Sequence, residues 1–253
     1  MAAASVIAVI PARYGSSRLP GKPLREIDGV PMVVRVWRCV TGANGIARVI
    51  VATDDERIAA VVRAAGGEAM ITSDRHPSGT DRVAEVAGRA RAAIYLNVQG
   101  DMPFSAPGDL DALVAPMIAD RRLTMATLAT PIVDDHEWGN PNVVKVVCDT
   151  RGDALYFSRA SIPFARAGGR PHQALRHIGI YAYRRAFLVR FAAMRLGMLE
   201  GIEMLEQLRA LENGYRIRVV TSVAPSPEVD TAEDLAAAEK FARQTMSGEA
   251  RRG

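Results

Sequence analysis

"SVIAVIPARYGSSRLPGKPL", residues 5–24, couples a β-branched apolar run to a basic loop. The run predicts a short strand, and the loop carries Arg13, Arg18 and Lys22 without an acidic residue to balance them. Its glycines let the backbone approach a ligand closely, while cations and free N–H groups suit an anion with several oxygens. We therefore interpret the loop as a phosphate-binding site, to which the alternative is a solvated basic turn.

The named phosphate-binding patterns do not describe this loop. The P-loop pattern G-x-x-x-x-G-K-[ST] fails because Gly15 and Gly21 are one residue too far apart and Pro23 replaces the metal-binding hydroxyl. The dinucleotide fingerprint G-x-G-x-x-G is absent as well. A nucleotide site here must therefore take its magnesium ligands from elsewhere in the chain.

Strand-like and helix-like segments alternate along the first hundred residues. Such repeats imply a parallel sheet covered by helices on both faces, which is an α/β fold. Ligands of these sheets bind at the carboxyl ends of the strands, where the basic loop and "VQGD" (98–101) both fall. The expected strands are 5–10, 48–53, 68–73 and 93–101, and the expected helices are 31–43, 54–67 and 80–92.

The second half of the chain has a different pattern, in which strands follow one another without helices between them. We expect these strands to form a smaller β lobe with mixed or antiparallel pairing. Because no linker rich in Gly, Ser or Pro divides the chain, residues 1–253 are predicted to form a single domain, with residues about 125–185 contributing the lobe. The expected strands of the lobe are 124–132, 142–149, 154–162 and 177–183.

Composition limits the class of protein. At 253 residues, 49% hydrophobic and 24% charged, the chain can bury a large core, and no run approaches the roughly 18 apolar residues of a membrane span. The N-terminus lacks the basic segment of a signal peptide. Cys39 and Cys148 are far apart and form no C-x-x-C pattern, so we expect buried free thiols in a cytoplasmic protein.

Two aspartates are the candidate magnesium ligands. Asp101 ends the apolar run "YLNVQGD" behind Gly100, which brings the backbone close to a ligand, and Asp230 lies where a helix begins. Magnesium typically takes one or two carboxylates and completes its octahedron with phosphate and water oxygens. We expect this pair to bind Mg²⁺. For Asp230 the alternative is an ordinary helix N-cap followed by Thr231.

Segments throughout the chain resemble the 3-deoxy-manno-octulosonate cytidylyltransferase family of lipopolysaccharide biosynthesis, over residues 5 to about 240. The basic loop alone is similar to the broader sugar-nucleotidyltransferase group, whereas the later segments are more specific. The resemblance implies a Rossmann-like, GT-A-like nucleotidyltransferase sheet, and a sugar-binding and dimerisation lobe in a homodimer. The segments are "IPARYGSSRLPGKPL", "VATDDERI", "SGTDRVAEV", "NVQGDMP", "NPNVVKVV", "ALYFSRASIP", "RHIGIYAYR", "IEMLEQLRALENG" and "VDTAEDL".

The resemblance also implies a reaction. The anomeric hydroxyl of 3-deoxy-D-manno-octulosonate (Kdo) attacks the α-phosphorus of CTP in line, which gives CMP-Kdo and pyrophosphate. Such a step depends mostly on positioning and charge neutralisation. The implied roles are triphosphate binding for Arg13, Arg18 and Lys22, and Mg²⁺ binding for Asp101 and Asp230.

Further residues are implied for the two substrates. Ser78, Gly79 and Gln99 would present backbone and amide groups to cytosine, and Arg159 would pair with the sugar carboxylate. The other residues implied for the sugar acid are His177, Tyr181, Glu206 and Gln207.

Taken singly, some of these residues have an ordinary interpretation. His177 before an apolar strand is then structural, and Glu206 is a solvated helix charge. The helix expected at 202–213 would place Met204, with Leu205 and Leu208, in the core.

Two departures from the family bear on the substrate. Met102 stands where the family usually has glutamate, which predicts weaker metal binding or altered ligand geometry, and the segment 164–175 is unusually glycine-rich. A related sugar acid, such as an 8-amino analogue or a nonulosonate, is therefore an alternative. A sialic-acid-activating enzyme is another alternative, against which "YFSRA" and "HIGIY" argue. A nucleic-acid-binding module is a third, supported by the net charge of +4 but by no motif.

Overall fold

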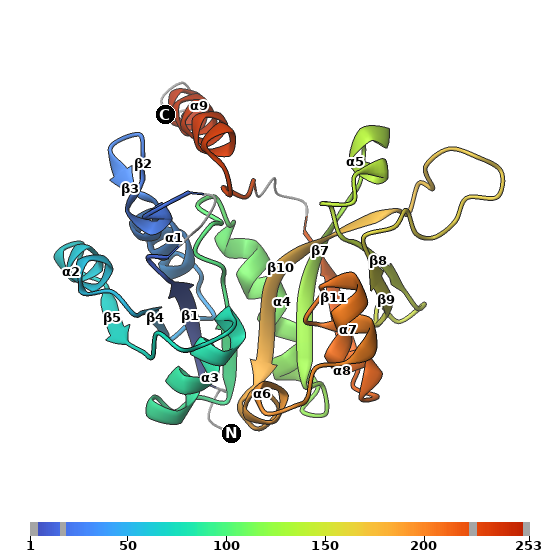
Figure 1. Cartoon of the computed structure of the whole chain (residues 1–253), viewed down its shortest axis with the longest axis horizontal. Coiled ribbons are helices and arrows are strands. Elements are labelled where there is room, and N and C mark those ends of the chain that lie inside the picture. Colours follow the sequence, from blue (N-terminus) through green and yellow to red (C-terminus); the bar gives the residue numbers. More distant parts are fainter. Residues whose placement is uncertain (1–4, 16–18, 223–226, 250–253) are drawn as a thin grey trace. The chain divides into compact units, whose positions relative to one another are not determined.

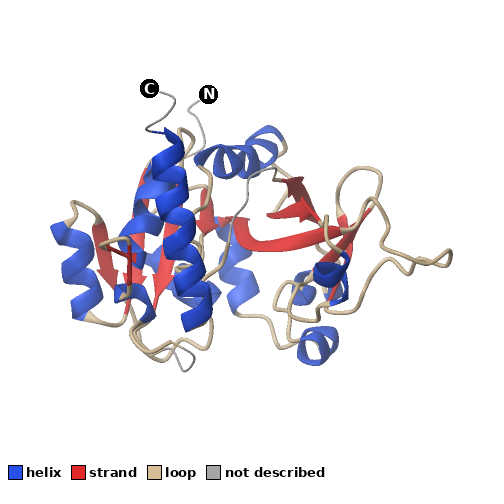
Figure 2. Cartoon of the chain, turned by 90° about the horizontal axis from the view of Figure 1, so that it is seen from above, coloured by secondary structure: helices blue, strands red, loops and turns tan. Residues whose placement is uncertain are grey.

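The computed structural model describes residues 5–15, 19–222 and 227–249. The chain forms two compact units, each assembled from separate stretches of sequence. Helices flank the strands in each unit, which confirms the predicted α/β class (Figure 2). The first unit comprises Val6–Arg91, Asn97–Leu110 and Ala224–Gly253, and the second comprises Met1–Ser5, Ala92–Leu96 and Asp111–Val223.

The first unit is built on parallel strands, with β4 paired to both β1 and β5. The register places Ile10 opposite Val51 and Ala52 opposite Met70. Residues Val6 to Ile10 are all at most 4% exposed. A continuous apolar run is typical of a parallel strand that is covered on both faces, and the predicted strand is confirmed. The strands are β1 (Val6–Ala12), β4 (Arg48–Thr53) and β5 (Glu68–Ile71), with a hairpin of β2 (Glu26–Ile27) and β3 (Val30–Pro31) (Figure 1).

The helices of the first unit follow the predicted pattern. The Asp55 carboxylate accepts the N–H of Arg57, and Ser78 Oγ accepts the N–H of Asp81, so each side chain caps the helix that follows it. The three helices expected from the sequence are confirmed within a few residues. The helices are η1 (Lys22–Leu24, 3-10), α1 (Met32–Thr41), α2 (Glu56–Ala64), α3 (Gly79–Arg89) and α9 (Ala232–Glu249).

A small hydrophobic cluster attaches the C-terminal helix to the segment that follows the basic loop. Leu19, Ile27 and Met32 pack with Val229 and with alanines of α9, and all are at most 6% exposed. The rings of Phe104 and Phe241 meet edge to face beside the cluster, with centroids 4.7 Å apart. This packing holds α9 and the residue Val229 before it against the segment that follows the basic loop.

The second unit contains the mixed strand pairing that the sequence predicts. Strand β7 pairs antiparallel with β10 and parallel with β11, and β8 pairs antiparallel with β9 and β10. Its strands are β7 (Met125–Pro131), β8 (Lys145–Cys148), β9 (Ala154–Ser158), β10 (Leu175–Arg184) and β11 (Ile217–Thr221). Its helices are α5 (Asp135–Gly139), α6 (Arg185–Ala192), α7 (Met198–Glu203) and α8 (Leu208–Glu212).

Two further elements contribute residues to both units. Strand β6 (Ile94–Asn97) lies within the segment expected to be a buried strand, and its four residues are buried. Helix α4 (Pro107–Ala119) is missing from the sequence-based prediction. Its interior Pro116 is a residue that normally disfavours a helix, because it lacks the N–H and crowds the preceding turn.

The helix expected at 202–213 is wrong as a single element. Met204 has φ +55° and ψ +47°, the left-handed conformation that ends α7, and α8 starts four residues later. Met204 is 75% exposed, so its predicted core position is also wrong. Leu205 and Leu208 are buried as predicted.

Cys39 and Cys148 are free thiols, but both are half-buried rather than buried. Burial raises the pKa of both, that of Cys148 to about 11, so at neutral pH they are protonated. Within the described residues, every helix is too short or too polar to span a lipid bilayer.

Candidate functional site

A pocket of about 260 Å³ opens at the carboxyl end of β1, entirely within the first unit. Four segments and one side chain far along the sequence form its wall. They are residues 11–13, 22–23, 76–79 with Arg82, 99–101, and Asp230. The pocket therefore collects the basic loop, the capped end of α3 and both candidate metal ligands, as the rule for ligand sites on parallel sheets predicts.

Lys22 lies between the two aspartates. Its Nζ donates to Asp101 Oδ2 at 2.9 Å and to Asp230 Oδ1 at 3.0 Å. Burial alone lowers the pKa of the ammonium, but the two carboxylates outweigh burial and raise the pKa above its ordinary value. The three side chains are between 15% and 31% exposed, so solvent screens this cluster only partly.

The N-cap interpretation of Asp230 is wrong, because the neighbouring residue caps the helix. Thr231 Oγ1 accepts the N–H of Asp234, and Asp234 Oδ2 accepts the N–H groups of Asp230 and Thr231. The N–H of Val229 is held by Asp101 O at 2.9 Å. This reciprocal cap fixes the backbone of the segment, while the Asp230 carboxylate is directed to Lys22.

The donor set at this point fits a hard divalent cation. Two carboxylates converge on a position that already attracts a cationic group, the Lys22 ammonium. No cluster of three or more His, Cys, Asp or Glu side chains occurs among the described residues, so a protein-only metal cage is not present there. Mg²⁺ is the ion that characteristically binds through one or two carboxylates and completes its shell from phosphate and water.

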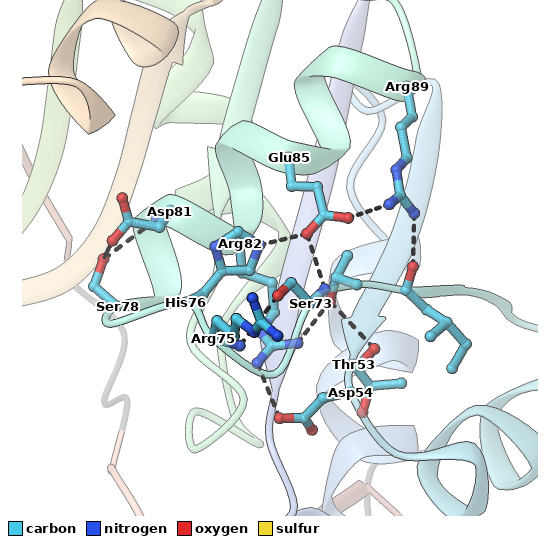
Figure 3. Close-up of polar contacts among 12 residues, drawn as sticks. Thr53, Asp54, Ser73, Arg75, His76, Ser78, Asp81, Arg82, Glu85 and Arg89 are labelled. Atoms are coloured by element: carbon cyan, nitrogen blue, oxygen red, sulfur yellow. Dashed lines mark hydrogen bonds and ion pairs between the residues drawn. The ribbon is translucent and has the colours of Figure 1, made fainter.

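The residues expected to face cytosine lie together on another wall of the pocket. Ser78 Oγ caps α3 and also donates to the Asp81 carboxylate at 2.7 Å (Figure 3). A Cβ on Gly79 would lie 3.2 Å from the Pro11 ring and 3.4 Å from Gln99 Oε1, so glycine allows this close approach. The α3 N-terminus and the Gln99 amide therefore face the same space.

Arg82 is a pocket residue that the sequence analysis missed. It is 3% exposed, and its guanidinium donates to Thr72 Oγ1 at 2.6 Å and to Asp54 Oδ2 at 3.1 Å (Figure 3). Asp54 Oδ1 is buried and has no hydrogen-bond partner among the described residues. A buried, oriented guanidinium is a strong donor for ligand oxygens. The sequence feature that indicates a buried role for Arg82 is its position as a charged residue on the apolar face of α3.

A second polar cluster supports the loop at 73–79. The Glu85 carboxylate contacts His76 Nε2 and the Arg89 guanidinium, and it accepts the N–H of Ser73 at 3.0 Å (Figure 3). Burial raises the pKa of Glu85, but the hydrogen bonds from His76 and Ser73 outweigh burial and leave the pKa below its ordinary value. His76 itself lines the pocket. The loop that carries Ser78 is thus held from the side of α3.

The two arginines predicted for the phosphate-binding loop, Arg13 and Arg18, differ in whether the structure describes them. Arg13 lines the pocket at the end of β1, whereas Arg18 lies outside the described residues. Met102, which the resemblance marks as a departure from the family, is 1% exposed, so its side chain is packed inside the unit.

Gly100 offers a test of the close backbone packing at this site. A Cβ there would lie 2.9 Å from Pro11 O, a backbone atom that cannot move without shifting the end of β1. We expect Gly100→Ala to lower the free energy of unfolding by about 1–3 kcal/mol. Gly88→Ala is the matched control in thermal denaturation, because a Cβ on Gly88 meets nothing within 4 Å. Equal melting temperatures for both variants would contradict this packing argument.

The predicted sugar-acid residues lie in the second unit. Arg159 follows β9, and its Nε donates to Glu203 O at 2.8 Å while Nη1 donates to Pro141 O at 3.2 Å. Glu206 is close to Arg209, with 3.9 Å between Oε1 and Nη2.

His177, Tyr181 and Gln207 form a buried row. The rings of His177 and Tyr181 are 5.4 Å apart, and Tyr181 Oη donates to Gln207 Oε1 at 3.1 Å. His177 Nε2 bonds Thr127 Oγ1 at 2.9 Å, and burial lowers the pKa of this histidine to about 3, so its ring is neutral. Gln207 Nε2 is buried without a hydrogen-bond partner in the described part of the chain. This amide is a donor that a substrate oxygen could satisfy.

The family model and two sequence relatives that match this chain are all cytidylyltransferases. A family model described as cytidylyltransferase matches residues 7–217. A 3-deoxy-manno-octulosonate cytidylyltransferase of Syntrophotalea carbinolica is 51% identical over 247 residues, which cover 94% of this chain and 99% of the relative. Another, from Geobacter metallireducens, is 49% identical over 240 residues, covering 91% of this chain and 94% of the relative.

Solved structures agree with the sequence relatives. A CMP:2-keto-3-deoxy-manno-octonic acid synthetase complexed with CTP is similar with a TM-score of 0.91 and 45% identity, covering 95% of this chain and 99% of the other. A cytidylyltransferase from Leptospira borgpetersenii has a TM-score of 0.62 at 16% identity and covers 96% of each chain. The second similarity concerns the fold alone.

Proposed function

The chain belongs to the 3-deoxy-manno-octulosonate cytidylyltransferase family, and on that premise we propose that it transfers CMP from CTP to Kdo and releases pyrophosphate. The observation that carries the proposal is the pocket in which Lys22, Asp101 and Asp230 meet. A triphosphate is a polyanion, so it needs both the basic loop and a charge-compensating cation.

The proposed reaction gives roles to four charged side chains of the pocket. The oxygen of the sugar hydroxyl forms a bond to the α-phosphorus and releases its proton to water. The bond between the α-phosphorus and the α,β-bridging oxygen breaks, and its electron pair leaves on pyrophosphate. Arg13 and Lys22 bind the phosphates and offset the charge that develops on the leaving group. Asp101 and Asp230 would hold Mg²⁺, which when bound neutralises phosphate oxygens and lowers the pKa of the attacking hydroxyl.

We assign recognition of the cytosine base to the wall of the pocket that contains Ser78, Gly79 and Gln99. The backbone N–H groups at Ser78 and Gly79 and the amide of Gln99 are donors and acceptors suited to a pyrimidine edge. Arg82, held by Thr72 and Asp54, adds a buried donor for the base or the ribose. We assign Arg82 to CTP binding.

The sugar acid is assigned to the second unit. Arg159 would pair with its carboxylate, and the buried row of His177, Tyr181 and Gln207 would bond its hydroxyls, together with Glu206. The Gln207 Nε2 group supports this assignment, since a buried donor without a partner is costly unless a ligand completes it. We also infer that the chain works as a homodimer in the cytoplasm, as the resemblance implies.

Pyrophosphate release from CTP is the experiment that tests the proposed reaction. The acceptors are Kdo, its 8-amino analogue and N-acetylneuraminate, each with and without Mg²⁺, and UTP replaces CTP in a parallel series. We expect release with CTP, Kdo and Mg²⁺ together. Preference for the 8-amino analogue or the nonulosonate would assign the chain to a related sugar acid, and release with none of the acceptors would contradict the proposal.

Arg159→Ala separates the two substrates. Losing one charged hydrogen-bond partner costs about 1.5–3 kcal/mol, so we expect the KM for Kdo to rise roughly ten- to a hundredfold while the KM for CTP is unchanged. Arg195→Ala, an exposed arginine of the same unit, is the control in steady-state kinetics. A raised KM for CTP with an unchanged KM for Kdo would remove Arg159 from the sugar site.

A further inference from the structure

Lys145, the first residue of β8, is a buried ammonium with three backbone partners. The side chain is fully buried, and Nζ donates to Asn140 O at 2.9 Å, Val143 O at 2.7 Å and Arg159 O at 2.7 Å. Its three donors are therefore all used. The ammonium joins the turn before β8 to the residue that follows β9.

Position 145 has a lysine in a chain whose basic residues are mostly arginines. Of the 32 basic residues in the chain, three are lysines and the rest are arginines. A buried ammonium is costly unless it is fully hydrogen-bonded, and three carbonyl oxygens that converge on one point suit a compact ammonium better than a planar guanidinium. Lys145 therefore stabilises one particular arrangement of the 140–143 turn and Arg159.

Glu203, the last residue of α7, holds Arg159 from the other side. Its carboxylate accepts the backbone N–H of Arg159 at 2.9 Å, Ser158 Oγ at 2.5 Å and Tyr156 Oη at 3.5 Å. Burial raises the pKa of Glu203, but these hydrogen bonds outweigh burial and keep the pKa below its ordinary value. Because the carboxylate stays ionised, it holds Arg159 at neutral pH.

Together these contacts fix four groups of Arg159. The backbone N–H is bound by the Glu203 carboxylate, the carbonyl by Lys145, Nε by Glu203 O and Nη1 by Pro141 O. Nη2 has no hydrogen-bond partner within residues 5–15, 19–222 and 227–249. The guanidinium is thus restrained, with one nitrogen remaining for a ligand.

We propose that Lys145 and Glu203 are positioning residues that hold the Arg159 guanidinium ready for the carboxylate of the sugar acid. This inference rests on the proposed function, in which Arg159 binds that carboxylate. A restrained arginine loses less conformational entropy on binding than one that is ordered by the ligand, so each positioning residue contributes to sugar affinity without touching the sugar.

A double-mutant cycle tests whether the two residues act through Arg159. Lys145→Met and Glu203→Gln are each made in the wild-type and in the Arg159→Ala background, with Lys240→Met as the exposed control. We expect each single variant to raise the KM for Kdo about tenfold with the KM for CTP unchanged. In the Arg159→Ala background neither change should raise the KM for Kdo further.

An NMR measurement keeps the test independent of turnover. The Arg159 Nε–H signal, assigned by its loss in Arg159→Ala, should exchange with water at least about tenfold faster in Lys145→Met and in Glu203→Gln. Glu203→Gln preserves side-chain volume, so it carries the test if Lys145→Met does not fold.

The outcomes separate the positioning inference from the proposed function. An unchanged exchange rate, or the same fold-change in the KM for Kdo in both backgrounds, overturns the positioning inference. Faster exchange in a chain that does not use Kdo supports the restraint of Arg159 and overturns the proposed function.

Discussion

In the Lys22→Ala variant, kcat falls by roughly a hundredfold or more, whereas the KM for CTP rises by less than about tenfold. The Lys22 ammonium is a compact charge in the pocket, and on the proposed mechanism its effect on catalysis would grow as negative charge builds on the departing pyrophosphate. On the proposed mechanism other groups of the pocket, among them Arg13, which lines it, would still bind the ground-state triphosphate. The loss therefore appears in kcat more than in KM.

The position of Lys22 also predicts how the rate of the Lys22→Ala variant depends on Mg²⁺. Lys22 is the cation that lies between Asp101 and Asp230, at 2.9 and 3.0 Å. Removing it leaves two carboxylates that repel each other, so the Mg²⁺ concentration for half-maximal rate should not rise. Steady-state kinetics across a Mg²⁺ titration measure both quantities, with Lys240→Ala as the control. A variant with wild-type kcat would remove Lys22 from the catalytic site.

The first part of the fold was predictable because its strand β1 is buried on both faces. The run at Val6–Ile10 is apolar at every position, and such a run can hardly be solvated. The position of the site followed from the same reasoning, since the carboxyl ends of parallel strands meet at one edge. Lys22, Asp101 and Asp230 converge there although up to 208 residues separate them.

Other features depend on contacts that a local pattern does not contain. Met204 has the spacing of a core residue, but its left-handed backbone ends α7 and exposes the side chain. Lys145 looks like a solvated residue at a strand end, yet it is buried and bonds three carbonyls, two from the 140–143 turn and one from Arg159. Arg82 looks like an ordinary helix charge until Asp54 and Thr72 are placed beside it. In each case the partner is distant in sequence or lies in an irregular segment.

Asp101→Asn and Asp230→Asn test the proposed magnesium site, for which the expected effect is as large as for Lys22. Asparagine preserves the size of the side chain but removes a hard anionic ligand. We expect each variant to need about ten times more Mg²⁺ for half-maximal rate, and to lose roughly a hundredfold in kcat when Mg²⁺ is saturating. Excess chelator should abolish turnover of the wild-type chain, because the phosphate charge is then not neutralised.

Stability measurements distinguish this metal role from a structural one. Both carboxylates are 26–31% exposed and paired with Lys22, and asparagine can still accept from its ammonium, so the free energy of unfolding should change by about 1 kcal/mol or less. Glu233→Gln, an exposed carboxylate in the first turn of α9, is the control for the same chemical change. Full activity in chelator would exclude the magnesium-dependent mechanism. A fall in kcat that follows the melting temperature, with the Mg²⁺ requirement unchanged, would instead assign the Lys22–Asp101–Asp230 cluster to the stability of the first unit.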